Sequence, residues 1–416
     1  MSDVPALADF DDPNYNPGTT EEIAFGDELD PHVSLRQLAA RGPVLEGDLR
    51  ELQGMAPDAT NAGLSKFVVF GYDEIKKILS DTDTFSVEPY RAGIAHTFGA
   101  YALLTLDPPE HTRYRRIFQK AFLPHMVAGW VQEFIDPAIN HLLDRVVGCG
   151  RCDLMAEFMA LYPFEIIYRQ LQLPPRDAEV FHRLSVALTL FMADFRRARE
   201  AHDKLGVYFK GLIEQRRRNP AKDLISVLAS TEVDGEYLMD EVLISFLRQL
   251  MNAAGDTTYR STGSMMVALL SQRPDQFEML KKDRSLIPRA VEETLRWEGP
   301  VNVAFRTAKR DVELCGVKIS TGSFINCVTG VASRDPAIYP DPDQFDMMRP
   351  HTRVPMAFGA GNHICLGQHL ARLEMTRALN LMLDRLPKLR LDTDYPAPQI
   401  RGNTMRTPRH LHVLLH

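Results

Sequence analysis

The sequence lacks any long run of apolar residues. No stretch of about 18 uncharged apolar residues occurs among its 416 residues, so no membrane-spanning helix is predicted. The N-terminal segment is acidic and interrupted by prolines, and it lacks the basic start and apolar core of a secretory signal peptide. These absences predict a cytoplasmic protein without a membrane anchor.

The chain also lacks a net positive charge and has few cysteines. The formal net charge is −7 at pH 7, which argues against a nucleic-acid-binding protein because such a protein needs a basic face. The five cysteines are an odd and scattered set, which predicts reduced thiols and no disulfide framework. Cys149 and Cys152 form a CxxC pair, but a zinc site needs a second pair and a redox site needs a following helix in a βαβ unit. We therefore interpret this pair as structural.

Over most of its length the chain shows the hydrophobic periodicity of α-helices. It is the main signal from about residue 105 to residue 296, and a last helix is predicted over residues 368–386. Short β-like runs such as VELCGVKI occupy residues 301–345, and RHLHVLL at the C-terminus alternates like a strand. No boundary resembles a flexible linker, so we predict one domain over residues 1–416, mainly α with a minor β portion.

The longest helical pattern, over residues 240–272, has an unusual middle. At about 1.5 Å per residue it spans on the order of 45–50 Å, enough to cross a whole domain. Its centre reads NAAGDTT, which combines small residues with side chains that compete for backbone hydrogen bonds. Two interpretations stay open: a functional site approached by a flat group, or a helix crossing that needs small residues, with the hydroxyls bonded back to carbonyls.

Two charged patterns carry little information when each is taken alone. Glu293 and Arg296 are three residues apart in EETLRW, which is usually a surface pair worth about 0.2–0.5 kcal/mol. His111 and Arg115 are four residues apart in EHTRYRR, which is most often a solvated basic face. Together, however, His111 and Arg115 could hold carboxylates of a bound group.

Cys365 lies in FGAGNHICLG, directly before the predicted C-terminal helix. A helix N-terminus stabilises a thiolate, and the surrounding glycines let the backbone turn tightly beside a flat ligand. A buried structural Cys, an acyl-transfer nucleophile and a metal ligand are the three alternatives. A nucleophile needs a positioned base, and His363 points the wrong way in an extended segment. Zinc needs more ligands than this segment offers, whereas porphyrin iron needs only one axial thiolate.

In this order along nearly the whole chain, these residues resemble the cytochrome P450 superfamily, in particular its soluble bacterial-type members. FGAGNHICLG is similar to the family's haem-binding loop FGxGxHxCxG, and DPPEHTRYRR to the helix that holds haem propionates. The resemblance implies a mainly α P450 domain with one haem b per chain, held between the long central helix and the Cys-loop helix.

The resemblance also implies roles for individual residues. Cys365 is the expected metal ligand, and Asp256 and Thr257 the expected proton-delivering pair. Haem contacts are expected from His111, Arg115, Ala253, Arg306, Phe358, Gly359, His363, Cys365 and Gly367. Glu293, Arg296 and Arg349 are expected to form a buried structural network.

Two positions depart from the family pattern. Ala254 stands where the central helix usually has glycine, which puts the detailed shape of the oxygen-binding kink in doubt. Ser333 stands where Asn is commoner, which we interpret as a minor change of turn.

The activity implied is a monooxygenase that hydroxylates a hydrophobic small molecule with O2. Electrons are expected from a ferredoxin with its NAD(P)H-dependent reductase, and neither nucleic acid nor a membrane anchor is expected. Basic residues near the propionate helix and the Cys loop form the expected ferredoxin-docking patch: Arg113, Arg116, Arg353 and Arg372. The alternatives are a peroxide-driven haem-thiolate oxygenase and a non-catalytic haem-binding sensor or carrier.

Substrate contacts are expected from apolar residues and from three amides. The set is Gln249, Asn252, Val301, Asn302, Phe305, Phe191 and Phe195. A buried amide without a partner costs about 1–3 kcal/mol, which favours a guest with a hydroxyl or carbonyl: a terpenoid, a steroid or a substituted aromatic. In the other interpretation these amides bond to nearby backbone and never meet the guest.

Overall fold

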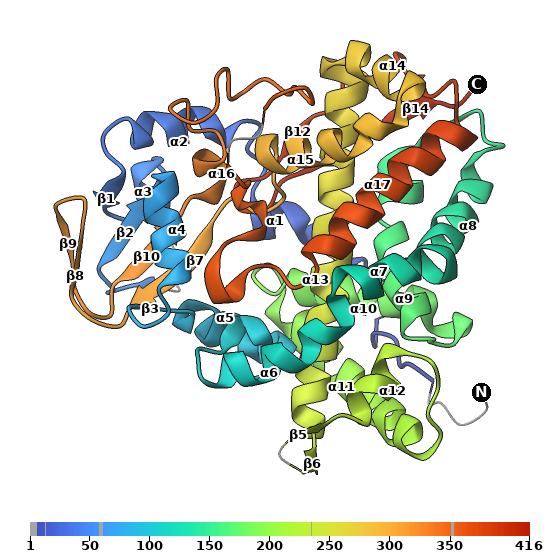
Figure 1. Cartoon of the computed structure of the whole chain (residues 1–416), viewed down its shortest axis with the longest axis horizontal. Helices are drawn as coiled ribbons and strands as arrows, with labels where there is room; N and C mark the ends of the chain where they lie inside the picture. The colour runs from blue at the N-terminus through green and yellow to red at the C-terminus, as the bar shows by residue number, and fades with distance from the viewer. Residues whose placement is uncertain (1–5, 13, 58–60, 234, 351–352) are drawn as a thin grey trace.

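The computed structural model describes residues 6–12, 14–57, 61–233, 235–350 and 353–416. A region rich in strands lies beside a larger helical region, and the long helix α13 (Asp240–Val267) runs through the helical one (Figure 1). The other longer helices are α2 (Pro31–Ala39), α4 (Tyr72–Ser80), α5 (Glu88–Phe98), α6 (Glu110–Phe118), α7 (Pro124–Trp130), α8 (Asp136–Val146), α9 (Tyr162–Gln170), α10 (Ala178–Thr189), α11 (Phe195–Arg218), α12 (Leu224–Ala229), α14 (Pro274–Lys282), α15 (Ile287–Trp297) and α17 (Gln368–Arg385). Three short ones are α1 (Glu21–Phe25), α3 (Leu49–Leu52) and α16 (Thr329–Ala332).

Five strands form the main sheet, in the order β1-β2-β10-β7-β3. Strand β10 pairs in parallel with β2, and the other pairs are antiparallel. Their bounds are β1 (Val44–Glu46), β2 (Lys66–Val69), β3 (Phe85–Ser86), β7 (Ala304–Ala308) and β10 (Phe324–Cys327).

The remaining strands form smaller sheets. A three-stranded sheet has the order β11-β14-β4, with β4 (Arg151–Asp153), β11 (Arg390–Leu391) and β14 (His412–Leu414). Three two-stranded sheets pair β5 (Glu232–Val233) with β6 (Glu236–Tyr237), β8 (Val312–Leu314) with β9 (Val317–Ile319), and β12 (Ile400–Arg401) with β13 (Thr407–Pro408).

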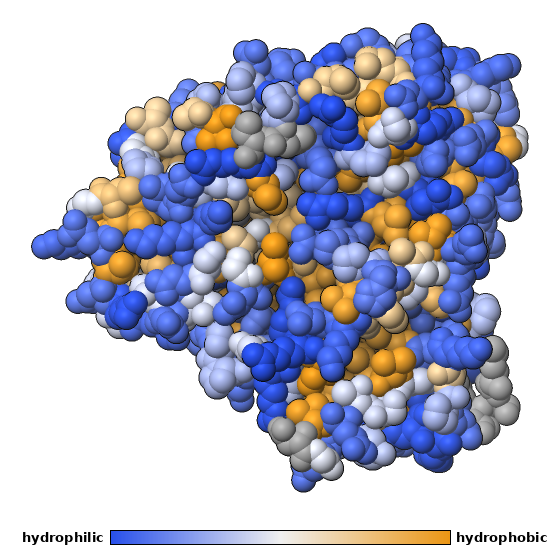
Figure 2. All heavy atoms as spheres, in the orientation of Figure 1, coloured by the Kyte–Doolittle hydropathy of each residue, from blue (hydrophilic) through white to orange (hydrophobic). Residues whose placement is uncertain are grey.

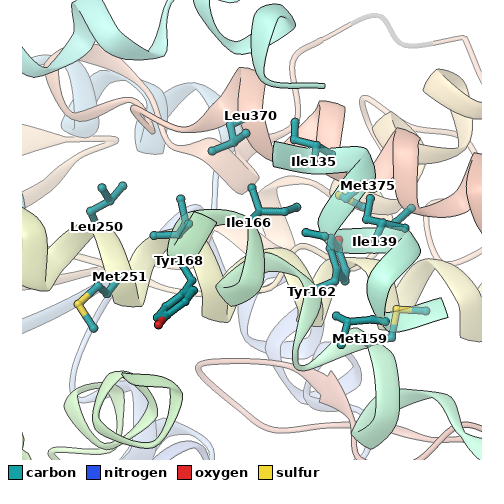
Figure 3. Close-up of a cluster of buried hydrophobic side chains, with 14 of the residues drawn as sticks. Ile135, Ile139, Met159, Tyr162, Ile166, Tyr168, Leu250, Met251, Leu370 and Met375 are labelled. Atoms are coloured by element: carbon teal, nitrogen blue, oxygen red, sulfur yellow. The ribbon is translucent and has the colours of Figure 1, made fainter. Parts of the chain in front are cut away.

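Helices α8, α9, α13 and α17 enclose the main hydrophobic core. Figure 3 shows Ile139 of α8, Tyr162 of α9 and Met375 of α17 close together, with Met251 of α13 farther along the same core. All four are fully or almost fully buried. This packing fixes α13 against α17, the helix that follows the Cys365 loop.

The prediction of a mainly α fold with a minor β portion is confirmed. The helix expected over residues 240–272 forms, as α13 followed by a π-helical turn over Ala268–Gln272, and the chain then restarts with Pro274 in the first turn of α14. Asp240 is the first helical residue of α13, and Met239 takes the cap position. Among the described helices, none is both long enough and apolar enough to cross a bilayer.

Candidate active site

The Cys365 loop is held in shape by backbone contacts. The Cys365 N–H donates to the Phe358 carbonyl at 2.9 Å, which closes the loop before α17 begins at Gln368. Gly359 and Gly361 both adopt a φ of 69°. Gly361 also lies against the backbone of Leu79 and Ser80 at the end of α4, where a Cβ atom has no room. The loop therefore requires glycine here on both conformational and steric grounds.

The thiol of Cys365 lies in a mixed environment. The residue is exposed to solvent, yet the protein around its sulfur desolvates the thiolate and so raises the pKa of the Cys365 thiol. The Gly367 N–H and the charges of Arg115 and Arg372 act in the opposite direction. Arg372 lies over the Phe358 ring at 4.4 Å and pairs with Glu292, so α15 and α17 fix it beside the loop.

Polar side chains without partners gather beside this loop. The rings of His111 on α6 and His363 in the loop are 3.9 Å apart. Both ring nitrogens of His111, Nε2 of His363 and Nε of Arg306 on β7 are buried and have no hydrogen-bond partner among the described residues. Burial, assisted by Arg115, lowers the pKa of His111 to about 4. Since buried polar groups are nearly always satisfied, this orphan cluster (His111, His363 and Arg306) indicates a guest that supplies hydrogen-bond acceptors.

The residues present fit haem. The orphan cluster and the half-buried Arg115 offer donors for carboxylates of the kind that haem propionates provide, and one thiol lies nearby for the iron. Ala253 is exposed although it lies in the middle of the central helix, as expected for a wall against which a flat group lies. On the face of the molecule drawn in Figure 2, hydrophobic side chains are recessed in the middle, between the strand-rich region and the helical region.

The NAAGDTT segment at the centre of α13 has features of both a helix crossing and an accessible site. Gly255 gives room to the Phe164 ring of α9, so this small residue serves a helix crossing. The Thr257 hydroxyl donates to the Ala253 carbonyl at 3.0 Å, a bond back to the preceding turn. Ala253 and Thr257 nevertheless lie on one face of the helix, and this is the face left accessible.

Asp256 is held by an arginine one turn further along the helix. Arg260 donates to both carboxylate oxygens, at 3.1 and 3.0 Å, and also contacts Glu21 at 2.5 Å. Burial raises the pKa of Asp256, and Arg260 opposes that shift. The sequence interpretation did not include Arg260 or Glu21. The spacing of four residues between Asp256 and Arg260 was a usable signal, whereas the contact with Glu21 depends on the tertiary fold.

Glu293, Arg296 and Arg349 form a closed buried network. Arg296 donates to both oxygens of Glu293 at 2.8 Å, and Arg349 Nε donates to Glu293 Oε1 at 3.1 Å. The remaining guanidinium donors of Arg296 reach the carbonyls of Ser333, Pro342 and Gln344. This network attaches α15 to the segment that leads into the Cys365 loop.

The amides expected to contact substrate lie in different surroundings. Asn252 donates to Thr189 on α10, and Asn302 donates to the Asn403 carbonyl at 3.0 Å. Gln249 differs, because its Oε1 is buried without a hydrogen-bond partner among the described residues. It lies one turn before Ala253, on the same face of α13.

The apolar residues expected to contact substrate are also dispersed. Phe305 packs between Tyr90 and Phe324, with ring centroids 5.7 and 5.5 Å away. Phe191 and Val301 are partly buried, whereas Phe195 is 51% exposed at the start of α11.

A cavity of about 500 Å³ lies on another flank of α13. It is bordered by Gly99–Tyr101, by α11 around His202 and Gly206, and by Arg248 of α13. Arg248 is five residues before Ala253, so the two side chains project about 140° apart around the helix. This cavity is therefore not the face that carries Ala253 and Thr257.

The arginines expected to form a docking patch are partly neutralised. Arg353 pairs with Asp73, and Arg372 pairs with Glu292. Arg113 and Arg116 are exposed on α6.

Comparisons with known proteins identify the family of this chain. The family model described as Cytochrome P450 matches residues 173–394. The cytochrome P450 monooxygenase PikC of Streptomyces venezuelae is 33% identical over 90% of this chain and 89% of its own length. The vitamin D3 dihydroxylase of Streptomyces griseolus is 36% identical over 70% of this chain and 71% of its own.

A solved structure gives the same result for the fold. CYP109E1 from Bacillus megaterium in complex with testosterone is similar with a TM-score of 0.81 and 28% identity, covering 93% of this chain and 99% of that one. The chain belongs to the cytochrome P450 family and is a monooxygenase that binds haem b.

Proposed function

We propose that the enzyme hydroxylates a hydrophobic molecule that carries an oxygen function: a terpenoid, a steroid or a substituted aromatic. Electrons come from a ferredoxin with its NAD(P)H-dependent reductase. The observation that carries the substrate class is the buried, unpartnered Oε1 of Gln249 on the accessible face of α13.

Gln249 favours a polar group on the guest. An unpaired buried acceptor costs about 1–3 kcal/mol, and a guest hydroxyl removes that cost. Asn252 and Asn302 already have protein partners, so Gln249 is the amide of the three that needs a hydrogen bond from the guest. The names of two relatives, which mention testosterone and vitamin D3, support a bulky and mostly apolar skeleton with few oxygen atoms.

Cys365 is proposed as the residue whose thiolate would ligate the haem iron, and His111, Arg115, Arg306 and His363 as the groups that would hold the propionates. The bound haem supplies O2 activation. Phe358 and Arg372 stack beside the loop and keep the thiolate side rigid.

Asp256 and Thr257 are proposed to deliver protons. The Asp256 carboxylate takes up a proton on the side where Arg260 and Glu21 lie, and it passes the proton toward Thr257 Oγ1. Arg260 keeps the carboxylate oriented and opposes the rise in pKa that burial causes.

Docking of the ferredoxin is proposed at α6, with Arg113 and Arg116 as the exposed charges. Arg116→Glu should slow reduction by a ferredoxin several-fold at low salt and have little effect at high salt. Reduction rates that ignore both the substitution and the ionic strength contradict docking there.

Matched ligands test the substrate class. Spectral binding titrations with a hydrocarbon, its ketone and its alcohol on one skeleton should show about tenfold tighter binding of the alcohol, whose O–H can donate to Gln249 Oε1, than of the other two. Gln249→Leu should remove that preference, whereas Asn252→Ala should retain it. Equal binding of all three ligands to the parent enzyme contradicts the proposal.

A further inference from the structure

Three potential metal ligands meet at the edge of the three-stranded sheet near the C-terminus. They are Asp153 on β4, His412 on β14 and His410, two residues before His412. One ligand atom from each lies within 4.8 Å of the other two. Figure 1 places β14 beside the C-terminus, and none of the three residues belongs to the Cys365 loop or the orphan cluster.

Sheet geometry brings these side chains together. His412 pairs directly with Asp153 in the antiparallel register of β14 and β4, so their side chains lie on the same face. His410 lies two residues earlier and projects to the same side. The two imidazole rings are stacked with centroids 5.5 Å apart and planes at 11°.

The ligand atoms are also held in orientation. Asp153 Oδ1 accepts the backbone N–H groups of Leu411 and Met155 at 2.9 and 3.1 Å, which directs Oδ2 toward His410 Nδ1 at 2.7 Å. The ring of Tyr395 stacks on His412 at 3.8 Å. Each of these contacts restricts a side chain that would otherwise be free to rotate at the surface.

We propose that Asp153, His410 and His412 bind a divalent transition-metal ion of the zinc class. Two imidazoles and a carboxylate are donors typical of Zn²⁺ and of neighbouring first-row ions. Ligand atoms of tetrahedral zinc, with bonds of about 2.0 Å, lie about 3.3 Å apart. Small side-chain rotations reach that spacing, and the fourth position goes to water.

The charges around the cluster favour a cation. The Asp392 N–H donates to the His412 carbonyl at 3.0 Å, and Arg151 pairs with Asp392 and Asp394 at 3.5 and 3.0 Å. Together with Asp153, these residues give three carboxylates against one guanidinium. A bound ion would connect the C-terminal strand to β4, which are more than 250 residues apart in the chain.

Zinc titration of the haem-loaded full chain, made without a histidine tag and freed of metal with a chelator, tests this site. Calorimetry with ZnCl2 should show one equivalent bound, and calorimetry with CoCl2 should show the same stoichiometry. Both titrations leave the haem spectrum unchanged. Absence of saturable zinc binding overturns the proposal.

Three variants separate this site from scattered surface histidines. His412→Ala and Asp153→Asn should each weaken zinc binding tenfold or more, and the Asn keeps an oxygen for the Leu411 and Met155 N–H groups. His125→Gln, which removes an exposed histidine on α7, should bind zinc like the parent. Equal zinc affinity of the parent and either cluster variant, with circular dichroism showing folded protein, means that Asp153 and His410 form only a hydrogen-bonded pair, and overturns the proposal.

Discussion

Two buried polar clusters in this protein differ in whether they are complete. Around Glu293, the carboxylate and both arginines satisfy one another and nearby carbonyls, and Glu293 and Arg296 are at most 1% exposed. In the orphan cluster, His111 and Arg306 are buried and His363 is partly buried, but together they leave four nitrogen atoms without a partner among the described residues. A complete cluster holds the fold together, whereas an incomplete one is shaped for a guest.

Breaking the complete cluster should have the largest effect. Glu293→Gln leaves Arg296 and Arg349 buried without a counter-charge, which costs about 3–5 kcal/mol. We expect little haem-loaded protein and a much lower melting temperature. Glu292→Gln, which alters the neighbouring partly exposed acid, serves as the control and should melt near the parent. A Glu293→Gln protein as stable as its parent would show that the network is dispensable.

Another buried charged cluster, around Glu298, can be weakened with acid. Burial by itself raises the pKa of Glu298, but Arg406, Arg334 and His32 outweigh it and hold the pKa well below its usual value of 4.5. Stability from this group is therefore present above pH 4.5 and is lost as the pH falls below it. Chemical denaturation between pH 6 and pH 4 should show a smaller loss of stability for Glu298→Gln than for the parent. Parallel curves for the two proteins contradict this expectation.

Replacing His111 in the orphan cluster should stabilise the haem-free protein but weaken its retention of haem. His111→Phe removes two unpartnered nitrogens, so the haem-free protein should gain about 1 kcal/mol in its free energy of unfolding. The same change removes a propionate contact, and haem transfer to an acceptor globin should be at least tenfold faster. Urea denaturation and transfer kinetics measure the two effects.

A satisfied histidine provides the matched control for that experiment. His182 is mostly enclosed, and its ring bonds to the backbone of Ala160. His182→Phe should destabilise the haem-free protein and leave haem transfer unchanged. If His111→Phe and His182→Phe behave alike, the distinction between complete and incomplete clusters fails.

The smallest structural effect is expected at the accessible face of α13. Thr257→Ala removes one hydroxyl that bonds to the Ala253 carbonyl, so folding and haem content should stay near the parent values. Consumed reducing equivalents should pass increasingly into hydrogen peroxide, while Asp256→Asn should mainly slow turnover. If both variants hydroxylate at the parental rate, with all consumed reducing equivalents going into product, then residues other than Asp256 and Thr257 deliver the protons.

Much of this arrangement could be predicted where the determining residues are close in sequence. The Cys365 loop, the helix that follows it and the long central helix all depend on local glycines, prolines and periodicity. The pairing of Glu293 with Arg296 likewise follows from a spacing of three residues on one helix.

Contacts between segments that are distant in the chain could not be predicted from the sequence. The pairing of Arg353 with Asp73 and of Arg372 with Glu292 reduces the basic patch, and neither partner is adjacent in the chain. The same holds for Asn252 with Thr189 and for Phe164 against Gly255. In each case tertiary packing determines which of several possible side chains becomes the partner, and residue spacing carries no information about that choice.

The ligation of Cys365 is the central claim, and one spectrum tests it most directly. The reduced carbon monoxide complex of the parent enzyme should show the strongly red-shifted Soret band of a thiolate ligand. Cys365→His should still bind haem through the orphan cluster but lose that band and all monooxygenase turnover. A red-shifted band that persists in Cys365→His would contradict the account.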